Sequence, residues 1–493
     1  MTALDSLRGL AVLMMTLSGI IPYDKPLPAW MYHAQEPPPT HDFNDRLAGL
    51  TWVDLVFPMF LFCLGAAIPI ALTRKLEGGV SRFKIVGSVL IRGALLAWYG
   101  VYLQHIRPTI LNPAPTAQTW WTALLGLLLL FLMYTRLPDR VSKSVRYLIT
   151  GAGFAGAILL MWSLRYPKGG YSHYFTTSRN DIIIMVLANM AVFGTLIWIA
   201  TRKNQLARLS ILPLYLALRL SATQPGWVKI VWKYTPTFGD DTPLAFLFNW
   251  DWLKYLFIVI PGTIAGDQIL KWMKAEKPDA TGDAPKPKGK RSGKWILLIF
   301  LCFGLIATLL TGLEGRHLWQ TTLVGLGMSG LIYWLTLTKK KSDAEPGAMT
   351  SDSETPTKEA LHDFAKWAGY WLLLGLLFEP FEGGIKKDHS TISYYFVTSA
   401  VALYALSAFI VLHQIFKMER MTRLLTAVGQ NPMIGYCAMG NLIQPILALT
   451  TLDVVFARWT PAPWAGVFIA LCETIAMALF VGFCTRIKLF WRA

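Results

Sequence analysis

The 493-residue chain has little charge and few cysteines. Only 15% of its residues are Asp, Glu, Lys or Arg, whereas soluble domains carry about 25%. The five cysteines form no CxxC pair, so we expect neither a disulfide framework nor a metal site. The first apolar stretch contains no Ala-x-Ala-like cleavage site, so we expect it to be a membrane span rather than a signal peptide.

What the chain has instead is apolar sequence. Hydrophobic residues make up 54% of it, the mean hydropathy is +0.43, and 20 residues are Trp. Apolar runs of about 20 residues can cross a hydrocarbon core of roughly 30 Å. The sequence therefore predicts an all-α, polytopic transmembrane helical bundle. Because two of the runs are short (208–222 and 366–381), we expect 11 to 14 spans. The candidate runs are 4–22, 52–73, 84–104, 118–135, 146–164, 181–200, 208–222, 251–270, 295–313, 318–337, 366–381, 391–415, 428–449 and 464–485.

Basic residues indicate the orientation of these spans. The formal net charge is +17, and Lys and Arg gather in alternate loops, for example at Arg136 and Arg140. This is the positive-inside pattern, and it predicts that both the N-terminus and the C-terminus lie in the cytoplasm. The positive charge is thereby explained without a nucleic-acid partner, and membrane lipids are the expected surroundings.

Two polar stretches divide the chain. Residues 274–294 and 339–365 are rich in Pro, Ser, Thr or Lys, and we expect both to be disordered cytoplasmic loops. They separate an N-terminal transmembrane block (1–273, with an outer loop at 23–51), a helical hairpin (295–338) and a C-terminal transmembrane block (366–493).

Polar residues inside predicted spans are candidates for function, although each can also be an internal pair that holds helices together. Asp5 and Arg8 are three positions apart on one helix face, which suits a structural ion pair. Arg92 lies about halfway along its span, far from either surface, and favours a role in holding a phosphate or carboxylate. Asp54 and Asn431 are further candidates.

The outer loop 23–51 is the most unusual stretch. It contains three consecutive prolines and two histidines, His33 and His41. Histidine can transfer a proton near neutral pH, but a single loop histidine is a weak signal. The turn GGIKKDH (383–389) is too generic to indicate a site, and no Ser-His-Asp set or phosphate-binding glycine loop is visible.

Several segments together resemble the heparan-α-glucosaminide N-acetyltransferase family and its bacterial relatives. The most specific are LDSLRGLAVLMM (4–15), MYHA (31–34) and LTWVDLVFPMFLFCLGAAI (50–68). The resemblance continues in FNWDWLKYLFIVIPGTIAGD (248–267), IKKDHSTISYYFVTSAVAL (385–403) and GQNPMIGY (429–436).

This resemblance implies acetyl transfer across a membrane. Acetyl-CoA would be the cytoplasmic co-substrate and an amino sugar at the outer face the acceptor. The family's catalytic histidine falls on His33, and Asp54 would orient its ring or bind the sugar. Arg8, Arg92 and Asn431 are the residues that we expect to bind CoA. The implied location is the bacterial cytoplasmic (inner) membrane, and a homodimer is left open.

This chain departs from the family at one place, and the departure leaves two other functions open. The family often has Asn near the outer end of the first span, where this chain has Leu17, Ser18 and Gly19. A secondary transporter of N-acetylated amino sugars or cell-wall sugar fragments would need broken helices near the membrane midplane, which Pro261-Gly262 and Asn431-Pro432 could supply. The third alternative is a membrane scaffold without activity.

Overall fold

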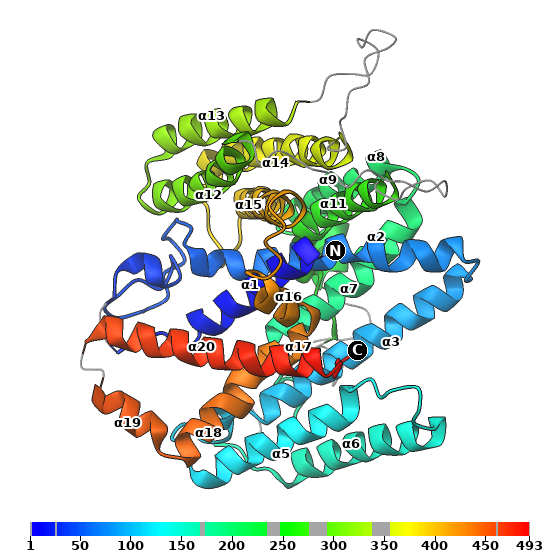
Figure 1. Ribbon diagram of the computed structural model, residues 1–493, viewed down its shortest axis with the longest axis vertical. Coiled ribbons are helices and arrows are strands. Elements are labelled where there is room, and N and C mark those ends of the chain that lie inside the picture. The colour runs from blue at the N-terminus through cyan, green and yellow to red at the C-terminus, as the bar shows by residue number, and fades with distance from the viewer. Residues whose placement is uncertain are drawn as a thin grey trace. The chain divides into compact units, whose positions relative to one another are not determined.

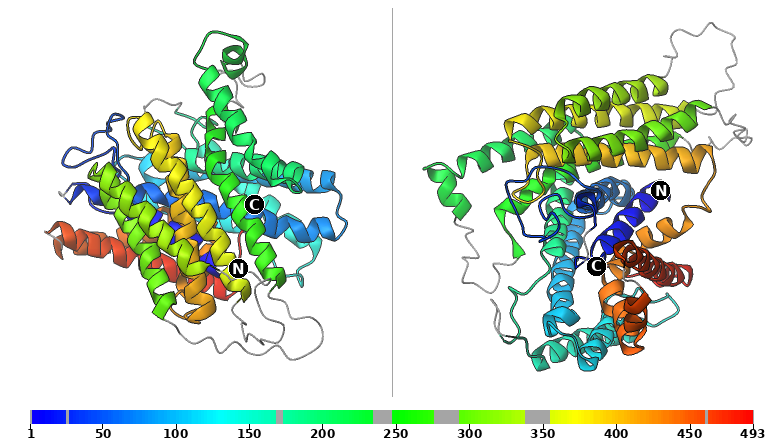
Figure 2. Two further views of the ribbon diagram at one scale, coloured as in Figure 1. Left: turned by 90° about the horizontal axis from the view of Figure 1, so that it is seen from above. Right: turned by 90° about the vertical axis from the view of Figure 1, so that its left-hand side faces the viewer.

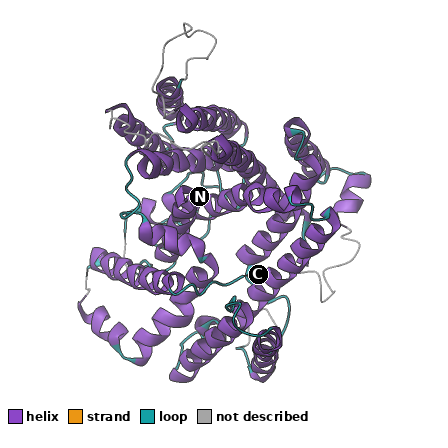
Figure 3. Ribbon diagram, turned by 45° about the vertical axis from the view of Figure 1, so that its right-hand side comes forward, coloured by secondary structure: helices purple, strands orange, loops and turns teal. Residues whose placement is uncertain are grey.

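The computed structural model describes residues 2–24, 27–167, 173–233, 247–275, 293–337, 355–459 and 462–492. Within these ranges the chain is helical, with helices joined by loops (Figure 3). The one β pairing described there is an isolated bridge between Thr135 and Trp491. The predicted all-α class is therefore confirmed.

The helices belong to two compact units, each built from segments far apart in sequence. Unit 1 comprises Met1–Ser18, Pro26–Gly78 and Phe257–Thr426. Unit 2 comprises Gly19–Lys25, Gly79–Leu256 and Ala427–Ala493. The units are therefore interleaved along the chain and do not follow the predicted sequential blocks.

Unit 1 is organised around α15 (Ile392–Ile410), every residue of which is buried. This helix packs against α14 (Thr355–Phe381), α12 (Gly293–Glu314), α2 (Trp52–Glu77) and α1 (Thr2–Ser18). The hairpin of α12 and α13 (Leu318–Thr336) lies beside α14, as the labelled helices in Figure 1 and the right-hand view of Figure 2 show. A helix that is apolar on all sides, as α15 is, needs this enclosure by neighbours.

Unit 1 also contains an unusually close helix pair. α11 (Leu256–Ala275) approaches α2 through glycines on both helices. A Cβ atom built on Gly262 would lie 2.4 Å from the carbonyl oxygen of Phe62, and one on Gly266 would lie 2.3 Å from that of Ala66. Only glycine fits this approach, which is the small-residue packing typical of membrane helices.

Unit 2 consists of three sets of packed helices. α3 (Arg82–His105) packs against α7 (Ile182–Thr201), and α5 (Ala117–Tyr134) packs against α6 (Lys143–Ser163). A helical stretch with a π-turn, residues Pro432–Leu449, lies against both α5 and α20 (Pro463–Arg486). The shorter elements of this unit are α4 (Pro108–Leu111), α8 (Gln205–Leu209), α9 (Ile211–Ser221), α10 (Trp227–Lys233), η3 (Trp250–Tyr255) and α19 (Leu452–Trp459).

Ten helices of the described part of the chain are long and apolar enough to cross a membrane. The protein is thus a multi-pass membrane protein. The predicted range of 11 to 14 is larger, and the difference lies in α1, α9, α13 and α14, which are outside that set of ten. The orientation of the termini stays a prediction.

Two predicted spans are corrected. The run 208–222 forms only α9, whose 11 residues extend about 16 Å, too short for a core of roughly 30 Å. The run 428–449 is corrected only at its start. α16 (Arg423–Gln430) ends before Asn431, and one helical stretch then runs from Pro432 to Leu449, made of α17 (Pro432–Ala438), a π-turn η6 (Met439–Ile443) and α18 (Gln444–Leu449). This stretch is long and apolar enough to cross the membrane, and Pro432 begins it at a position where the missing backbone N–H of proline costs nothing.

The predicted loops are partly corrected at their ends. α14 begins at Thr355, so residues 355–365 of the predicted disordered loop 339–365 are helical. Similarly, α11 continues to Ala275 and α12 begins at Gly293. The remainder of the segments predicted as 274–294 and 339–365 lies outside the described residues.

Candidate active site

The first turn of α2 places Asp54 at the end of the loop 23–51. Thr51 precedes the helix, and Asp54 is the third helical residue, where its side chain can reach back to the cap. Asp54 Oδ2 accepts hydrogen bonds from the Thr51 backbone N–H at 3.0 Å and from the Ala34 N–H at 3.2 Å. The Thr51 hydroxyl donates to the carbonyl of Tyr32 at 2.7 Å, which ties the loop to the helix.

His33 lies against the other oxygen of the same carboxylate. Its Nδ1 is 2.7 Å from Asp54 Oδ1, and the Asp54 side chain is only 2% exposed while that of His33 is 23% exposed. Because an ionised carboxylate can only accept, Nδ1 carries the proton, and in the neutral ring Nε2 is then the acceptor. The two residues predicted as catalytic are therefore in direct contact, with the acid buried and the base accessible.

Lys387 is the third member of this cluster, and the sequence did not single it out. Its Nζ is 3.2 Å from Nδ1 and 3.3 Å from Nε2 of His33. An ammonium group in the plane of the ring and equally far from both nitrogens would collide with Cε1, so Lys387 lies over the face of the imidazole. The weak signal for it was the turn GGIKKDH (383–389), which also lies in one of the segments of family resemblance.

The segment that carries Lys387 is fixed to the His33 loop by paired hydrogen bonds. Gln35 Nε2 donates to the Asp388 carbonyl at 3.0 Å, and the Asp388 N–H donates to Gln35 Oε1 at 2.7 Å. The Gly49 N–H donates to the Ile385 carbonyl at 2.9 Å. Gly384 has a φ of 115°, and a Cβ there would lie 2.2 Å from Ala48 Cβ, so this close approach requires glycine.

The helix α15 is anchored at the same place. Glu382 accepts hydrogen bonds from the backbone N–H groups of Ile392 at 2.6 Å and Ser393 at 2.8 Å, which are free at the start of a helix. The hydroxyl of Tyr394 donates to the Asp54 carbonyl at 2.8 Å and connects α15 to α2. The scaffold of the His33 site thus consists of hydrogen-bonded groups within unit 1, among which Gln35, Asp54 and Tyr394 are buried.

His41, the other histidine of the loop, has a different environment. Its Nδ1 is 3.2 Å from the Glu36 carbonyl, and its ring meets that of Tyr32 edge to face at 4.3 Å. It therefore has a packing role within the loop.

The residues predicted to bind CoA are found in separate surroundings. Arg8, in unit 1, forms an ion pair with Asp5 at 3.3 Å, as the spacing predicted. Arg92 is exposed on α3 of unit 2. Asn431, also in unit 2, is buried, and its amide is engaged by the C-terminal segment. It donates to the Leu489 carbonyl at 2.7 Å and to Thr485 Oγ1 at 3.3 Å, and it accepts from the Trp491 N–H at 3.2 Å.

Unit 2 contains a buried polar cluster that sequence reasoning missed. Arg107 lies 2.6 Å from Asp181, whose carboxylate also accepts from the Tyr436 hydroxyl at 2.9 Å and from the first N–H groups of α7. Burial tends to lower the pKa of the Arg107 guanidinium, but the attraction of Asp181 outweighs it and holds that pKa above its ordinary value. This geometry suits a structural anchor between α7, α17 and the α3–α4 junction.

Metal ligation has no candidate in the described ranges, where no group of three or more His, Cys, Asp or Glu residues could hold an ion. All five cysteines are free thiols, and Cys63, Cys302, Cys437 and Cys484 are buried. The chemistry available at the His33 site is therefore that of imidazole, carboxylate and ammonium groups.

Fold and site together define a multi-pass helical membrane protein with a His–Asp pair at the start of a membrane-spanning helix. A family model described as "Domain of unknown function (DUF5009)" matches residues 1–269, and the chain belongs to this family. The chain is also similar to heparan-alpha-glucosaminide N-acetyltransferase from Homo sapiens, with 40% identity over 55 residues, and from Mus musculus, with 42% over 55 residues. These matches cover 11% of this chain and 8% of each relative. The similarity to a membrane acetyltransferase is thus weak and confined to a short segment.

Proposed function

We propose that this protein transfers an acetyl or related acyl group from cytoplasmic acetyl-CoA to an amino sugar at the outer face of the membrane. The observation that carries the proposal is the 2.7 Å contact between His33 Nδ1 and the buried Asp54 carboxylate. An accessible imidazole oriented by a buried acid is the arrangement that general-base catalysis of acyl transfer uses. The short similarity to membrane acetyltransferases points to the same class of reaction.

The proposed reaction assigns one task to each residue. The amine of the acceptor attacks the thioester carbonyl, a C–N bond forms, and His33 Nε2 takes the proton that the amine loses. The C–S bond then breaks, and the sulfur leaves as the thiol of CoA with that proton. Asp54 keeps Nδ1 protonated and stabilises the imidazolium that forms in between. Lys387 places a positive charge beside the carbonyl oxygen that becomes negative.

Binding of acetyl-CoA is proposed for Arg8 and Arg92, whose guanidinium groups suit phosphates. Asn431 is the weakest of the predicted contacts, because both of its amide donors are already used by the C-terminal segment. The residues that hold the amino sugar are not assigned beyond the His33 site.

One observation favours a transporter as the second candidate. Residues 423–449 form a broken helix with a π-turn, and discontinuous helices form the substrate sites of many secondary transporters. Such a protein would move N-acetylated amino sugars without chemistry at His33.

The experiment that tests the proposal compares the purified wild-type, His33→Ala and His41→Ala proteins in liposomes. We expect His33→Ala to lose transfer of labelled acetyl groups to glucosamine-type acceptors by about 10²-fold or more, with acetyl-CoA binding retained. His41→Ala controls for damage to the loop and should stay close to wild type. Sugar uptake without CoA that persists in His33→Ala would overturn the enzyme and favour the transporter.

A further inference from the structure

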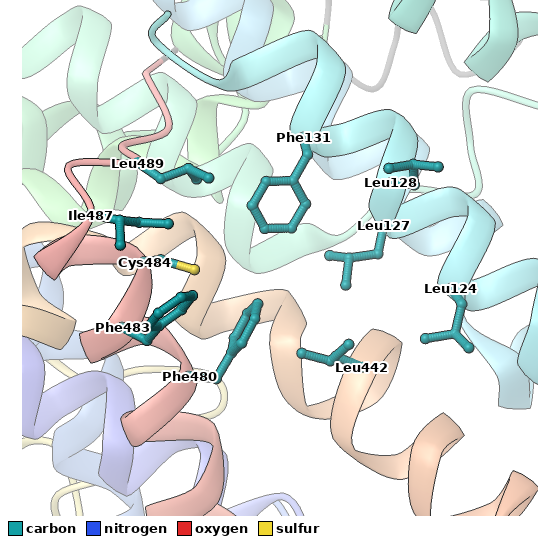
Figure 4. A pocket seen from close by; sticks show the side chains of 10 residues that line it. All are labelled: Leu124, Leu127, Leu128, Phe131, Leu442, Phe480, Phe483, Cys484, Ile487 and Leu489. Atoms are coloured by element: carbon teal, nitrogen blue, oxygen red, sulfur yellow. The ribbon is translucent and has the colours of Figure 1, made fainter. Parts of the chain in front are cut away.

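An apolar hollow in unit 2 is independent of the His33 site. It has a volume of about 340 Å³ and lies between α5, α20 and the helical stretch Pro432–Leu449. Figure 4 shows ten side chains around it, all of them Leu, Ile, Phe or Cys. On α5 the lining runs from Leu124 to Phe131, and on α20 from Phe480 to Cys484, followed by Ile487 just after the helix. The seven steps from Leu124 to Phe131 extend about 10 Å along a helix, so the hollow is an elongated groove.

A π-turn lies at the wall of the groove. Leu442, in the π-turn η6, lines the groove between the two long helices. A π-turn widens the backbone, and α18 after it has only six residues.

Both walls belong to membrane-spanning helices, so the groove faces hydrocarbon rather than water. α5 and α20 are among the ten helices long and apolar enough to cross the membrane. Phe483, Leu128 and Ile487 line the groove and are also exposed at the surface of the chain. Because the groove is apolar and is exposed to lipid between two membrane-spanning helices, it suits an acyl chain.

Basic residues stand at one end of the groove. Arg486 and Lys488 alternate in sequence with the lining residues Ile487 and Leu489, and both are exposed. Arg136, at the end of α5, is brought to the same place because its backbone N–H donates to the Phe490 carbonyl at 2.9 Å.

These three cations are not neutralised by an ion pair with any acidic residue of the described chain. In the described part of the chain no carboxylate forms an ion pair with Arg136, Arg486 or Lys488, and the nearby Asp139 is paired with Arg146 at 3.2 Å. Basic clusters beside membrane helices on the cytoplasmic side attract anionic headgroups, and this end is the cytoplasmic one in the predicted topology.

We infer that unit 2 binds one anionic glycerophospholipid of the inner leaflet. One of its acyl chains would occupy the groove between α5 and α20, and its phosphate would lie between Arg136, Arg486 and Lys488. A phospholipid joins a negative group to a hydrocarbon chain in the order in which the groove presents cations and apolar walls.

The test is native mass spectrometry of the full chain released from nanodiscs that contain equal amounts of phosphatidylglycerol and phosphatidylcholine with the same acyl chains. We expect one phosphatidylglycerol to be retained in preference. The double variant Arg136→Gln/Lys488→Gln should reduce that retention about tenfold or more, because each basic contact near an anionic lipid contributes about fivefold. The matched control Arg82→Gln/Lys84→Gln removes two exposed cations elsewhere in unit 2 and should change nothing.

A second variant keeps the test decisive if the double variant folds poorly. Leu128→Trp fills the groove from a position that is 56% exposed, and it should also release the lipid. Equal retention of both lipids, or retention unchanged by either variant, would overturn the inference. Displacement of the bound mass by millimolar inorganic phosphate would show a plain anion site, and a protein dimer in place of the adduct would show that a second copy covers the groove. Either result would also refute the inference that unit 2 binds a lipid.

Discussion

At the scale of single residues, the contact between His33 and Asp54 gives the two imidazole nitrogens different roles. Nδ1 is held at 2.7 Å from the carboxylate, and Nε2 is the nitrogen that the proposed reaction uses as the base. Asp54 has a second duty, because its other oxygen accepts from Ala34 and Thr51 and thereby starts α2. The acid thus joins the candidate chemistry to the fold of the loop.

Asp54→Asn should separate these duties. An amide cannot face both His33 and the N–H groups of Ala34 and Thr51 with oxygen, so either the ring is held in the wrong tautomer or two donors oppose each other. We expect kcat for acetyl transfer to fall by about 10³–10⁴-fold with acetyl-CoA binding preserved. Steady-state kinetics and a thermal unfolding curve measure the two effects, and a variant with more than half of the wild-type rate would refute the role of the charge.

Lys387→Met tests the third member of the cluster. The ammonium group lies 3.3 Å from His33 Nε2, close to where the reacting carbonyl must be. Loss of one group that stabilises the developing negative charge should lower kcat by about 10–10²-fold, with little change in acetyl-CoA affinity. Lys387→Arg keeps the charge and should recover part of the rate. If Met and Arg variants are equally slow, the lysine acts through shape and its charge has no role.

The sequence could identify His33 and Asp54 because both lie in short segments of family resemblance. Lys387 could not be found in this way, since a lysine in a polar turn after two glycines is ordinary, and its meaning depends on a contact across 354 positions. For Asn431 the role in CoA binding stays a prediction. Its observed partners are backbone groups of Leu489 and Trp491, which no local pattern indicates.

At the scale of elements, the packing of α2 against α11 determines where Asp54 can lie. The two backbones approach so closely that a methyl group on Gly262 would meet the Phe62 carbonyl at 2.4 Å. The Phe62 carbonyl and the Gly262 Cα both belong to helix backbones. Neither of them can therefore move unless a whole helix shifts.

Gly262→Ala should therefore destabilise the protein by about 1–3 kcal/mol and lower the rate of acetyl transfer through a displaced α2. Gly327→Ala is the matched control, because a Cβ on that helical glycine would have nothing within 4 Å. Thermal unfolding in detergent compares the two. An unchanged midpoint for Gly262→Ala would mean that the helices are less tightly packed than described.

Elements with long apolar runs were predictable, and those defined by interruptions were not. The hydrophobic pattern located α2, α3, α7, α12 and α20 because each needs about 20 apolar residues to cross the membrane. It also located the helical stretch Pro432–Leu449, but it placed the start at residue 428, inside α16, and it gave no sign of the π-turn, which has no compositional signal. The start of α14 at Thr355 was missed because its first turns are polar.

At the scale of the whole molecule, the arrangement of basic loops predicts both termini in the cytoplasm and the loop 23–51 outside. Asp45→Cys and Lys143→Cys place single exposed thiols in the outer loop and at a predicted inner end. A membrane-impermeant maleimide should label the first in intact cells and the second only after permeabilisation. The unsubstituted chain sets the background. Labelling of position 143 in intact cells would reverse the orientation and with it the direction of the proposed transfer.

The distance in sequence between His33 and Lys387 has a consequence for biosynthesis. At about 5–20 residues per second, a ribosome adds the 354 positions between them in roughly 20–70 s. During that interval the loop and the first turn of α2 have been made without the segment that fixes them through Gln35 and Gly49. The cell therefore keeps an unfinished His33 loop at its membrane for up to about a minute per molecule, within reach of proteases and insertion factors. A ribosome that stalls before residue 382 leaves a product without the candidate site.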